Sequence, residues 1–97
     1  MFGLIGKLTA TPGDGAHLAS ILVEGTREMP GCICYIVAAD AGDADTLWVT
    51  EVWESEAAHA ASLQLPSVQA AIAQGRPHIT GLERVATTRP LSSGSSR

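Results

Sequence analysis

The sequence predicts one α+β domain, in which an antiparallel sheet carries its helices on one face. Three observations lead to this fold class. The chain of 97 residues is long enough for one domain and too short for two. Four segments have the alternating or β-branched pattern of strands, and helical patterns lie between the first and second and between the third and fourth. The connection between the second and third is short enough for a hairpin.

The first strand is expected over residues 2–9, where Leu4 and Leu8 share one face and Ile5 lies on the other. Both faces of this strand are therefore expected to be at least partly covered. The turn residues that follow place Asp14 as the cap of a helix. One stripe of this helix is apolar or small, and consists of Leu18, Ile21, Leu22 and Gly25. A Met-Pro-Gly sequence then ends the helix.

A hairpin is expected in the middle of the chain. Residues 32–39 are β-branched and aromatic at their centre, and residues 46–53 alternate regularly. The polar connection over residues 40–45 joins them as antiparallel neighbours. One face of the second strand carries Leu47, Val49, Glu51 and Trp53, and the other carries Trp48, Thr50 and Val52.

Two short helices follow the hairpin. Ser55 is expected to cap an alanine-rich helix, which Pro66 breaks while starting a second one. The second helix is expected to end at Gly75 as its C-cap. Its inward residues are expected to be Val68, Ala71 and Ile72.

The last strand is expected over residues 79–87, which completes the order β-α-β-β-α-β of a ferredoxin-like fold. The domain is expected to span residues 1–89, and the Ser- and Gly-rich tail over residues 90–97 to be disordered. Because both faces of the strands carry large apolar groups, a monomer would expose a hydrophobic patch on the helix-free face. A twofold-related second copy covers such a patch with the same face, so a homodimer is expected.

Composition and charge exclude several classes of function. The net charge is −4 and the six basic residues are scattered, so nucleic acid is not an expected partner. The first ten residues lack the features of a signal peptide, and no apolar run is long enough to cross a membrane. A cytoplasmic location is therefore expected, without membrane partners. Cys32 and Cys34 are expected on one face of a strand as small buried hydrophobes, because their spacing disfavours a disulfide.

Three segments carry a recognisable pattern. They are Met29-Pro30-Gly31-Cys32-Ile33-Cys34-Tyr35, Thr50-Glu51-Val52-Trp53-Glu54-Ser55-Glu56-Ala57-Ala58 and Leu65-Pro66-Ser67-Val68-Gln69. In this order, and on these elements, they resemble the antibiotic biosynthesis monooxygenase family, quinol monooxygenases among them. The resemblance runs over about residues 2–88, which is essentially the whole domain.

The resemblance implies a dimeric α/β barrel in which two sheets face each other and each subunit keeps its own pocket. Members of the family oxidise aromatic phenols and quinols with molecular oxygen, commonly without flavin, metal or haem, so no cofactor is expected. A small aromatic substrate and molecular oxygen are the expected partners of the homodimer. Oxygenation of this kind requires a base for the phenolic proton, a water-excluding aromatic wall and a group that stabilises negative charge.

Three strand residues are candidates for these roles. Trp53 matches the signature tryptophan of the family and is the candidate wall, with an ordinary core position as the alternative. Glu51 shares its face and is a candidate proton acceptor, unless it only bridges to a helix end or across a dimer. Tyr35 is a candidate hydrogen-bond donor to the substrate, or else an interface residue.

The family commonly carries a histidine nine residues after the signature tryptophan, and here that position is Ser62. His59 lies one turn earlier on the same side of the helix and is the candidate base in its place, with solvent exposure as the alternative. Haem-degrading relatives share a triad of asparagine, tryptophan and histidine. The chain contains no asparagine, so haem degradation is not expected.

Ser62 is itself a candidate for substrate binding, and Arg76 and His78 are further candidates at the rim of a pocket. Arg76 has the alternative of complementing a helix dipole, and His78 that of surface packing. The three histidines are too widely spaced for a local metal motif, so no metal site is expected.

The sequence thus predicts a cofactor-independent monooxygenase that oxidises a small quinol or phenol. The alternatives are a non-catalytic ligand-binding or accessory dimer on the same fold, and a component of a larger metabolic assembly.

Overall fold

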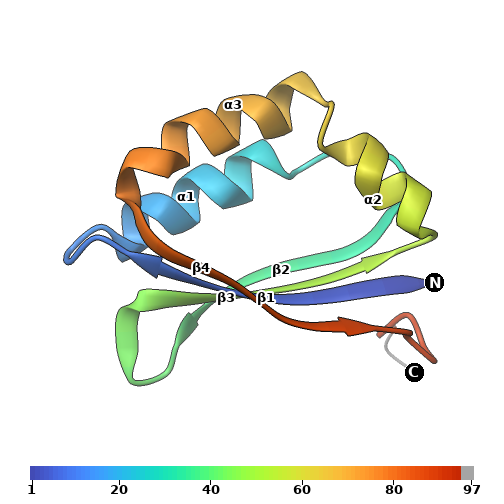
Figure 1. Cartoon of the computed structure of the whole chain (residues 1–97), viewed down its shortest axis with the longest axis horizontal. Coiled ribbons are helices and arrows are strands. Elements are labelled where there is room, and N and C mark those ends of the chain that lie inside the picture. The colour runs from blue at the N-terminus through green and yellow to red at the C-terminus, as the bar shows by residue number, and fades with distance from the viewer. Residues whose placement is uncertain (95–97) are drawn as a thin grey trace.

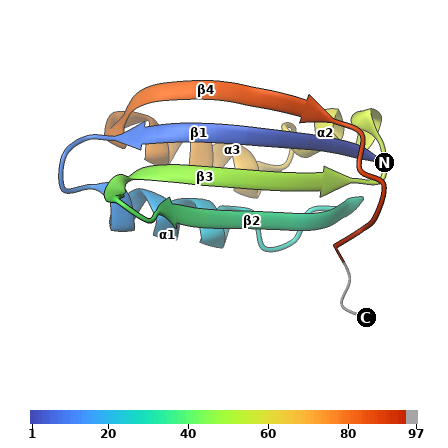
Figure 2. The ribbon, with the colours of Figure 1, turned by 90° about the horizontal axis from the view of Figure 1, so that it is seen from below.

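The computed structural model describes residues 1–94 and confirms the expected fold class. Its sheet contains β1 (Phe2–Ala10), β2 (Cys32–Asp40), β3 (Asp43–Trp53) and β4 (Ile79–Thr88). The strands are antiparallel throughout and lie in the order β2-β3-β1-β4. The helices are α1 (Gly15–Gly25), α2 (Glu56–Ser62), α3 (Pro66–Gly75) and the 3-10 turn η1 (Arg76–His78). All of them lie on one side of the sheet (Figure 1), and no helix lies on the opposite side (Figure 2).

The core forms where the apolar faces of the strands, made by every second residue, pack against the helices. Leu8 pairs with Leu47 across β1 and β3, as the alternation predicts, and both side chains are buried. Leu18 of α1 packs on them and is completely buried. Farther along the helix layer, a Cβ on Gly25 would stand 2.4 Å from Cβ of Ala71, so this glycine lets α1 and α3 approach each other closely.

The start of α1 differs from the prediction in the residue that caps it. Asp14 occupies the N-cap position, but its side chain caps no backbone N–H and is paired with His78 instead. The carboxylate of Asp45 on β3 accepts hydrogen bonds from the N–H groups of Gly13 and Gly15, at 3.0 and 2.9 Å. The cap therefore comes from a residue 30 positions away in the sequence.

The predicted break between α2 and α3 is confirmed, as is the cap at Ser55, whose Oγ accepts a hydrogen bond from Ala58 N–H. Two details were wrong. Ile72 is 43% exposed, and the buried residues of α3 are Val68, Ala71 and Gly75. Gly75 has φ −78° and is no left-handed cap, since the chain continues directly into η1.

Register shifts interrupt the regular alternation of the edge strands, two in the pairing of β2 with β3 and two in that of β4 with β1. In β2 the register shifts between Cys32, opposite Trp53, and Cys34, opposite Val52. The two thiols therefore belong to opposite faces, which corrects the prediction that they share one; both are free and partly buried. In β4 the register shifts between Ala86, opposite Ile5, and Arg84, opposite Gly6.

Residues 90–94 contain neither helix nor strand, and the remainder of the tail predicted to be disordered lies outside the described residues. None of the helices formed by residues 1–94 is long and apolar enough to cross a membrane.

Candidate active site

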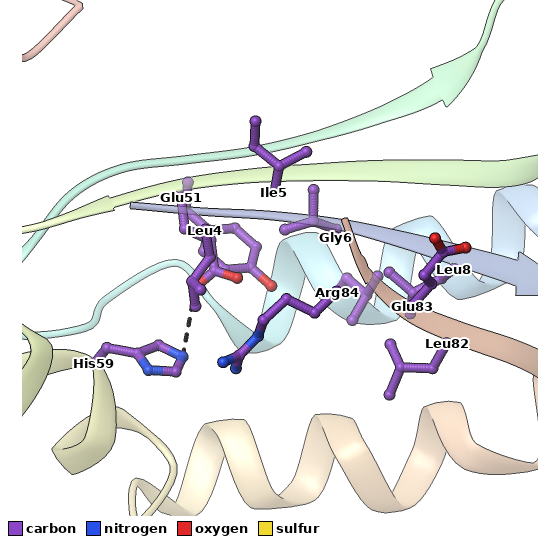
Figure 3. Close-up of a pocket in the computed structure, with 12 residues that line it drawn as sticks. Leu4, Ile5, Gly6, Leu8, Glu51, His59, Leu82, Glu83 and Arg84 are labelled. Carbon is purple, nitrogen blue, oxygen red and sulfur yellow. Dashed lines mark ion pairs between the residues drawn. The ribbon is translucent and has the colours of Figure 1, made fainter. Parts of the chain in front are cut away.

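A cavity of about 450 Å³ lies between the sheet and the helices. Its floor is formed largely by strand residues of the core face, Leu22 of α1 and His59 of α2 border it on the helix side, and it is open to solvent beside the exposed Leu82 of β4. Gly6 lies in the middle of this floor, between Leu4 and Leu8. A Cβ at Gly6 would meet nothing closer than 3.7 Å, so the missing side chain leaves space for a ligand. Figure 3 shows how these residues surround the cavity.

Glu51, Trp53 and His59 form a connected group at one end of the cavity. The indole Nε1–H of Trp53 donates a hydrogen bond of 2.9 Å to Oε1 of Glu51. The same oxygen lies 3.9 Å from Nε2 of His59, as the dashed line in Figure 3 marks. This distance allows charge stabilisation but is too long for a hydrogen bond. Each group can therefore still bind a hydroxyl placed between them.

The imidazole of His59 is held by aromatic contacts. Its ring stands edge-on to Trp53 at a centroid distance of 5.4 Å and is tilted against Phe2 at 5.7 Å. The side chains of His59 and Glu51 are each only 15% exposed. The alternative of a solvent-exposed histidine is therefore wrong, and the Glu51–His59 pair stands in a largely dehydrated setting.

Tyr35 borders the same space from β2, where it pairs in register with Glu51. Burial raises the pKa of its phenol well above the ordinary value, and the nearby carboxylate of Glu51 and thiol of Cys32 add to this effect. The hydroxyl thus stays protonated and can donate a hydrogen bond, whereas it cannot serve as a base near neutral pH.

Trp53 and Ser62 lie behind this cavity rather than on its wall. Trp53 is 1% exposed and packs with Met29 and Val68 in a core cluster. Trp53 and Ser62 both line a smaller cavity of about 130 Å³, which adjoins the Glu51–His59 pair. Ser62 is buried, and its hydroxyl donates to the carbonyl oxygen of His59 at 2.6 Å. The structure therefore makes Trp53 a core residue that holds Glu51 in place.

The remaining two predicted site residues are not brought to the cavity. Arg76 is exposed at the end of α3. His78 pairs through Nδ1 with Asp14 at 2.8 Å and stands edge-on to His17, at the end of the helix layer away from α2 (Figure 1). Within residues 1–94, no group of three or more His, Cys, Asp or Glu side chains is placed to hold a metal ion.

The structure adds two residues that sequence reasoning did not single out. Arg84 of β4 lines the cavity and extends toward the end where Glu51 and His59 face each other (Figure 3). Its place opposite Gly6 on the core parity depends on the register shifts in β4, for which the sequence has no clear signal. Gly6 could have been found, because it is the one small residue between Leu4 and Leu8 on the core parity of β1.

Comparison with known proteins gives a consistent family. Residues 1–74 match the family model for antibiotic biosynthesis monooxygenases. A crystal structure from Chloroflexus aurantiacus, provisionally described as such a monooxygenase, is 55% identical with a TM-score of 0.90, covering 94% of this chain and 93% of its own. A second from Deinococcus radiodurans is 26% identical with a TM-score of 0.77, covering 100% and 99%.

A third structure, from Nitrosomonas europaea, is 11% identical with a TM-score of 0.85 and covers 95% of this chain and 100% of its own, which shows the shared fold. No protein of curated function matches the chain significantly. Because the family model covers most of the chain and agrees with the fold and with the 55% identical structure, the chain belongs to the antibiotic biosynthesis monooxygenase family.

Proposed function

We propose that this protein is a cofactor-independent monooxygenase that oxidises a small quinol or phenol with molecular oxygen. The observation that carries the proposal is the Glu51–His59 pair at the end of a cavity large enough for an aromatic ring system. Oε1 of Glu51 lies 3.9 Å from Nε2 of His59, and each side chain is 15% exposed. The cavity is bordered mainly by apolar side chains, which suits an aromatic ligand. Family membership supports a monooxygenase over other uses of such a pocket.

The reaction begins with the loss of a phenolic proton to the imidazole of His59. The phenolate is electron-rich enough to reduce oxygen, and Glu51 stabilises the imidazolium that forms. One oxygen atom enters the ring and the other leaves as water, so a dihydroxy-aromatic plus O₂ gives a hydroxyquinone plus H₂O. The substrate supplies all the electrons, and no external reductant is required.

Two further groups stabilise the negative charge that develops. The Tyr35 hydroxyl stays protonated and donates a hydrogen bond to a substrate oxygen. No ion pair within residues 1–94 involves Arg84, so its guanidinium is available to the phenolate or to reduced oxygen. Arg84 and its neighbour Leu82 are exposed at the β4 side of the cavity, whereas Glu51 and His59 are only 15% exposed. Interactions at the Glu51–His59 end are therefore the less screened ones.

The functional unit that we propose is a homodimer. The helix-free face of the sheet carries Ile5, Val52 and the 52% exposed Ile36, and no helix of residues 1–94 covers it (Figure 2). A twofold-related copy would bury this apolar surface with the same surface. Each subunit then keeps its own cavity on the helix side of its sheet.

The decisive experiment measures oxygen consumption by metal-free protein with a panel of hydroquinones, naphthoquinols and anthrones. We expect at least one compound to be oxidised well above its spontaneous rate. A ligand-induced rise of Tm without turnover on the whole panel would favour the non-catalytic binding module instead.

Two substitutions locate the activity in the cavity. His59→Gln keeps a polar side chain of similar length and removes the base, so kcat is expected to fall by about 10²-fold or more. His17→Gln is the matched control, because His17 is an exposed histidine outside the cavity. Equal rates for the two variants would contradict the role of His59.

A further inference from the structure

The smaller cavity behind the Glu51–His59 pair is not used by the aromatic substrate in the reaction proposed above. Its volume is about 130 Å³, well below the roughly 300 Å³ at which pockets for organic ligands begin. It shares four lining residues with the main cavity, namely Leu22, Tyr35, Glu51 and His59. The two spaces therefore meet at the pair that is proposed to start the chemistry.

The wall of this smaller cavity is largely apolar. Most of its remaining residues are hydrophobic: Met29, Trp53, Leu63, Val68, Ala71 and Ile72. The hydroxyl of Thr26 donates to Leu22 O and that of Ser62 to His59 O, each at 2.6 Å. The indole N–H of Trp53 is likewise engaged by Glu51. These three donors are thus already used.

Such a wall selects a small apolar occupant. A buried water needs two to four polar partners, and Tyr35, Glu51 and His59 provide free ones only where the two cavities meet. The rest of the wall has the character of apolar cavities that stay dry and take up guests such as xenon. The proposed reaction itself requires one small apolar molecule, which is dioxygen.

We propose that this smaller cavity is an oxygen chamber, which holds O₂ beside the Glu51–His59 pair while the main cavity holds the aromatic substrate. The assignment rests on the proposed function for the identity of the gas. Leu63 and Ile72, 44% and 43% exposed, both line the chamber and give it a side toward solvent at α2 and α3. Oxygen can therefore enter by a route separate from the main cavity.

Ser62 gives the chamber part of its volume. It stands where relatives commonly carry a histidine, and in this chain it is buried and lines the chamber. A bulky imidazole at this position would occupy part of the space and bring a polar nitrogen into it. The small residue at this position thus fits a chamber for a gas, while His59 provides the imidazole.

Xenon is a direct probe, because it occupies apolar gas sites whether or not the protein is active. Crystals pressurised with xenon are expected to show a xenon atom between Trp53 and Val68. Val68→Met fills the chamber with a flexible side chain and is expected to remove that atom. Ala70→Met, on the same helix at an exposed position that does not line the chamber, is the matched control. A chamber that stays empty under xenon in the unmodified protein would overturn the proposal.

Steady-state kinetics test the oxygen role. Val68→Met is expected to raise the KM for oxygen about threefold or more with the KM for the quinol unchanged, while Ala70→Met changes neither. If Val68→Met does not fold, Ile72→Trp narrows the exposed side of the chamber and is expected to have the same effect.

The two proposals fail in different ways. Turnover without bound xenon, or with an unchanged KM for oxygen in a folded chamber variant, overturns the oxygen chamber and leaves the monooxygenase. Bound xenon without turnover on any phenol or quinol overturns both the monooxygenase and the oxygen role of the chamber.

Discussion

Glu51 connects every part of the candidate site. It accepts the indole N–H of Trp53, faces His59 at 3.9 Å and lies opposite Tyr35 in the sheet. A carboxylate in so dehydrated a place is tolerated because these groups offer it hydrogen bonds or charge. The alternation of β3 and the family resemblance singled out Glu51 and Trp53 in the sequence. The hydrogen bond between them was not foreseeable, because it depends on rotamers that only the packed core selects.

Tyr35 provides a clean spectroscopic test at the residue scale, since it is the only tyrosine. Burial keeps the pKa of its phenol above the ordinary value of 10.0. The neutral phenol therefore contributes stability that is complete below pH 10 and declines as the pH rises further. Tyrosinate absorption is expected to appear only together with unfolding, followed by circular dichroism in the same titration.

The effect of the Glu51 charge on the pKa of Tyr35 can be separated from the effect of burial. Glu51→Gln removes the nearby negative charge and is expected to lower the tyrosine midpoint only modestly, because burial is the larger cause. A midpoint near pH 10 in the folded, unmodified protein would contradict the dehydrated setting described for the cavity.

At the scale of elements, the bounds of strands and helices were largely predictable, and the details that join them were not. Four strands, the broken second helical region and the cap at Ser55 follow from local patterns and agree with the structure. The bulges in β2 and β4 were missed, since register is decided by pairing with β3 and β1 rather than by local sequence. For this reason the cysteines were assigned to one face and Arg84 was overlooked.

The cap of α1 is an element-scale feature that can be tested. Asp45→Ala leaves the N–H groups of Gly13 and Gly15 without their carboxylate and is expected to cost about 0.5–2 kcal/mol. For a domain of this size, each kcal/mol lowers Tm by roughly 4–8 °C. Asp45→Asn keeps one of the two acceptor oxygens and places an NH₂ group against the other N–H, so it is expected to restore only part of the stability. Equal melting temperatures for both variants would show that the hydrogen bonds are unimportant.

For the whole molecule, the site depends on contacts between distant segments. The main cavity takes residues from all four strands and from α1 and α2. Tyr35, Glu51 and His59 were identified from the sequence because they lie in or next to the family motifs. Arg76 and His78 were placed at the same pocket wrongly, because the sequence does not show at which end of the domain η1 lies. The expected apolar helix-free face is present, with Ile36 52% exposed on it.

The proposed homodimer gives a prediction at this scale. Ile36→Lys places a charge on the helix-free face and is expected to convert the dimer into a monomer, because a buried unpaired charge opposes association. Val23→Lys is the control, since Val23 is 49% exposed on α1, away from that face. Light scattering coupled to gel filtration measures both. A dimeric Ile36→Lys protein would place the interface elsewhere.

Gly6 gives the fold a simple route to new specificities. The floor of the main cavity is open at this one position, in the middle of a strand that is held on both sides, and its backbone does not require glycine. A methyl group there would meet only ordinary contacts. Alanine, valine or leucine at position 6 would therefore narrow the cavity stepwise, with little disturbance of the strand pairing around it. A lineage that exchanges substrates of different breadth can do so by single mutations at this codon, while the proton acceptor and its supporting residues stay unchanged.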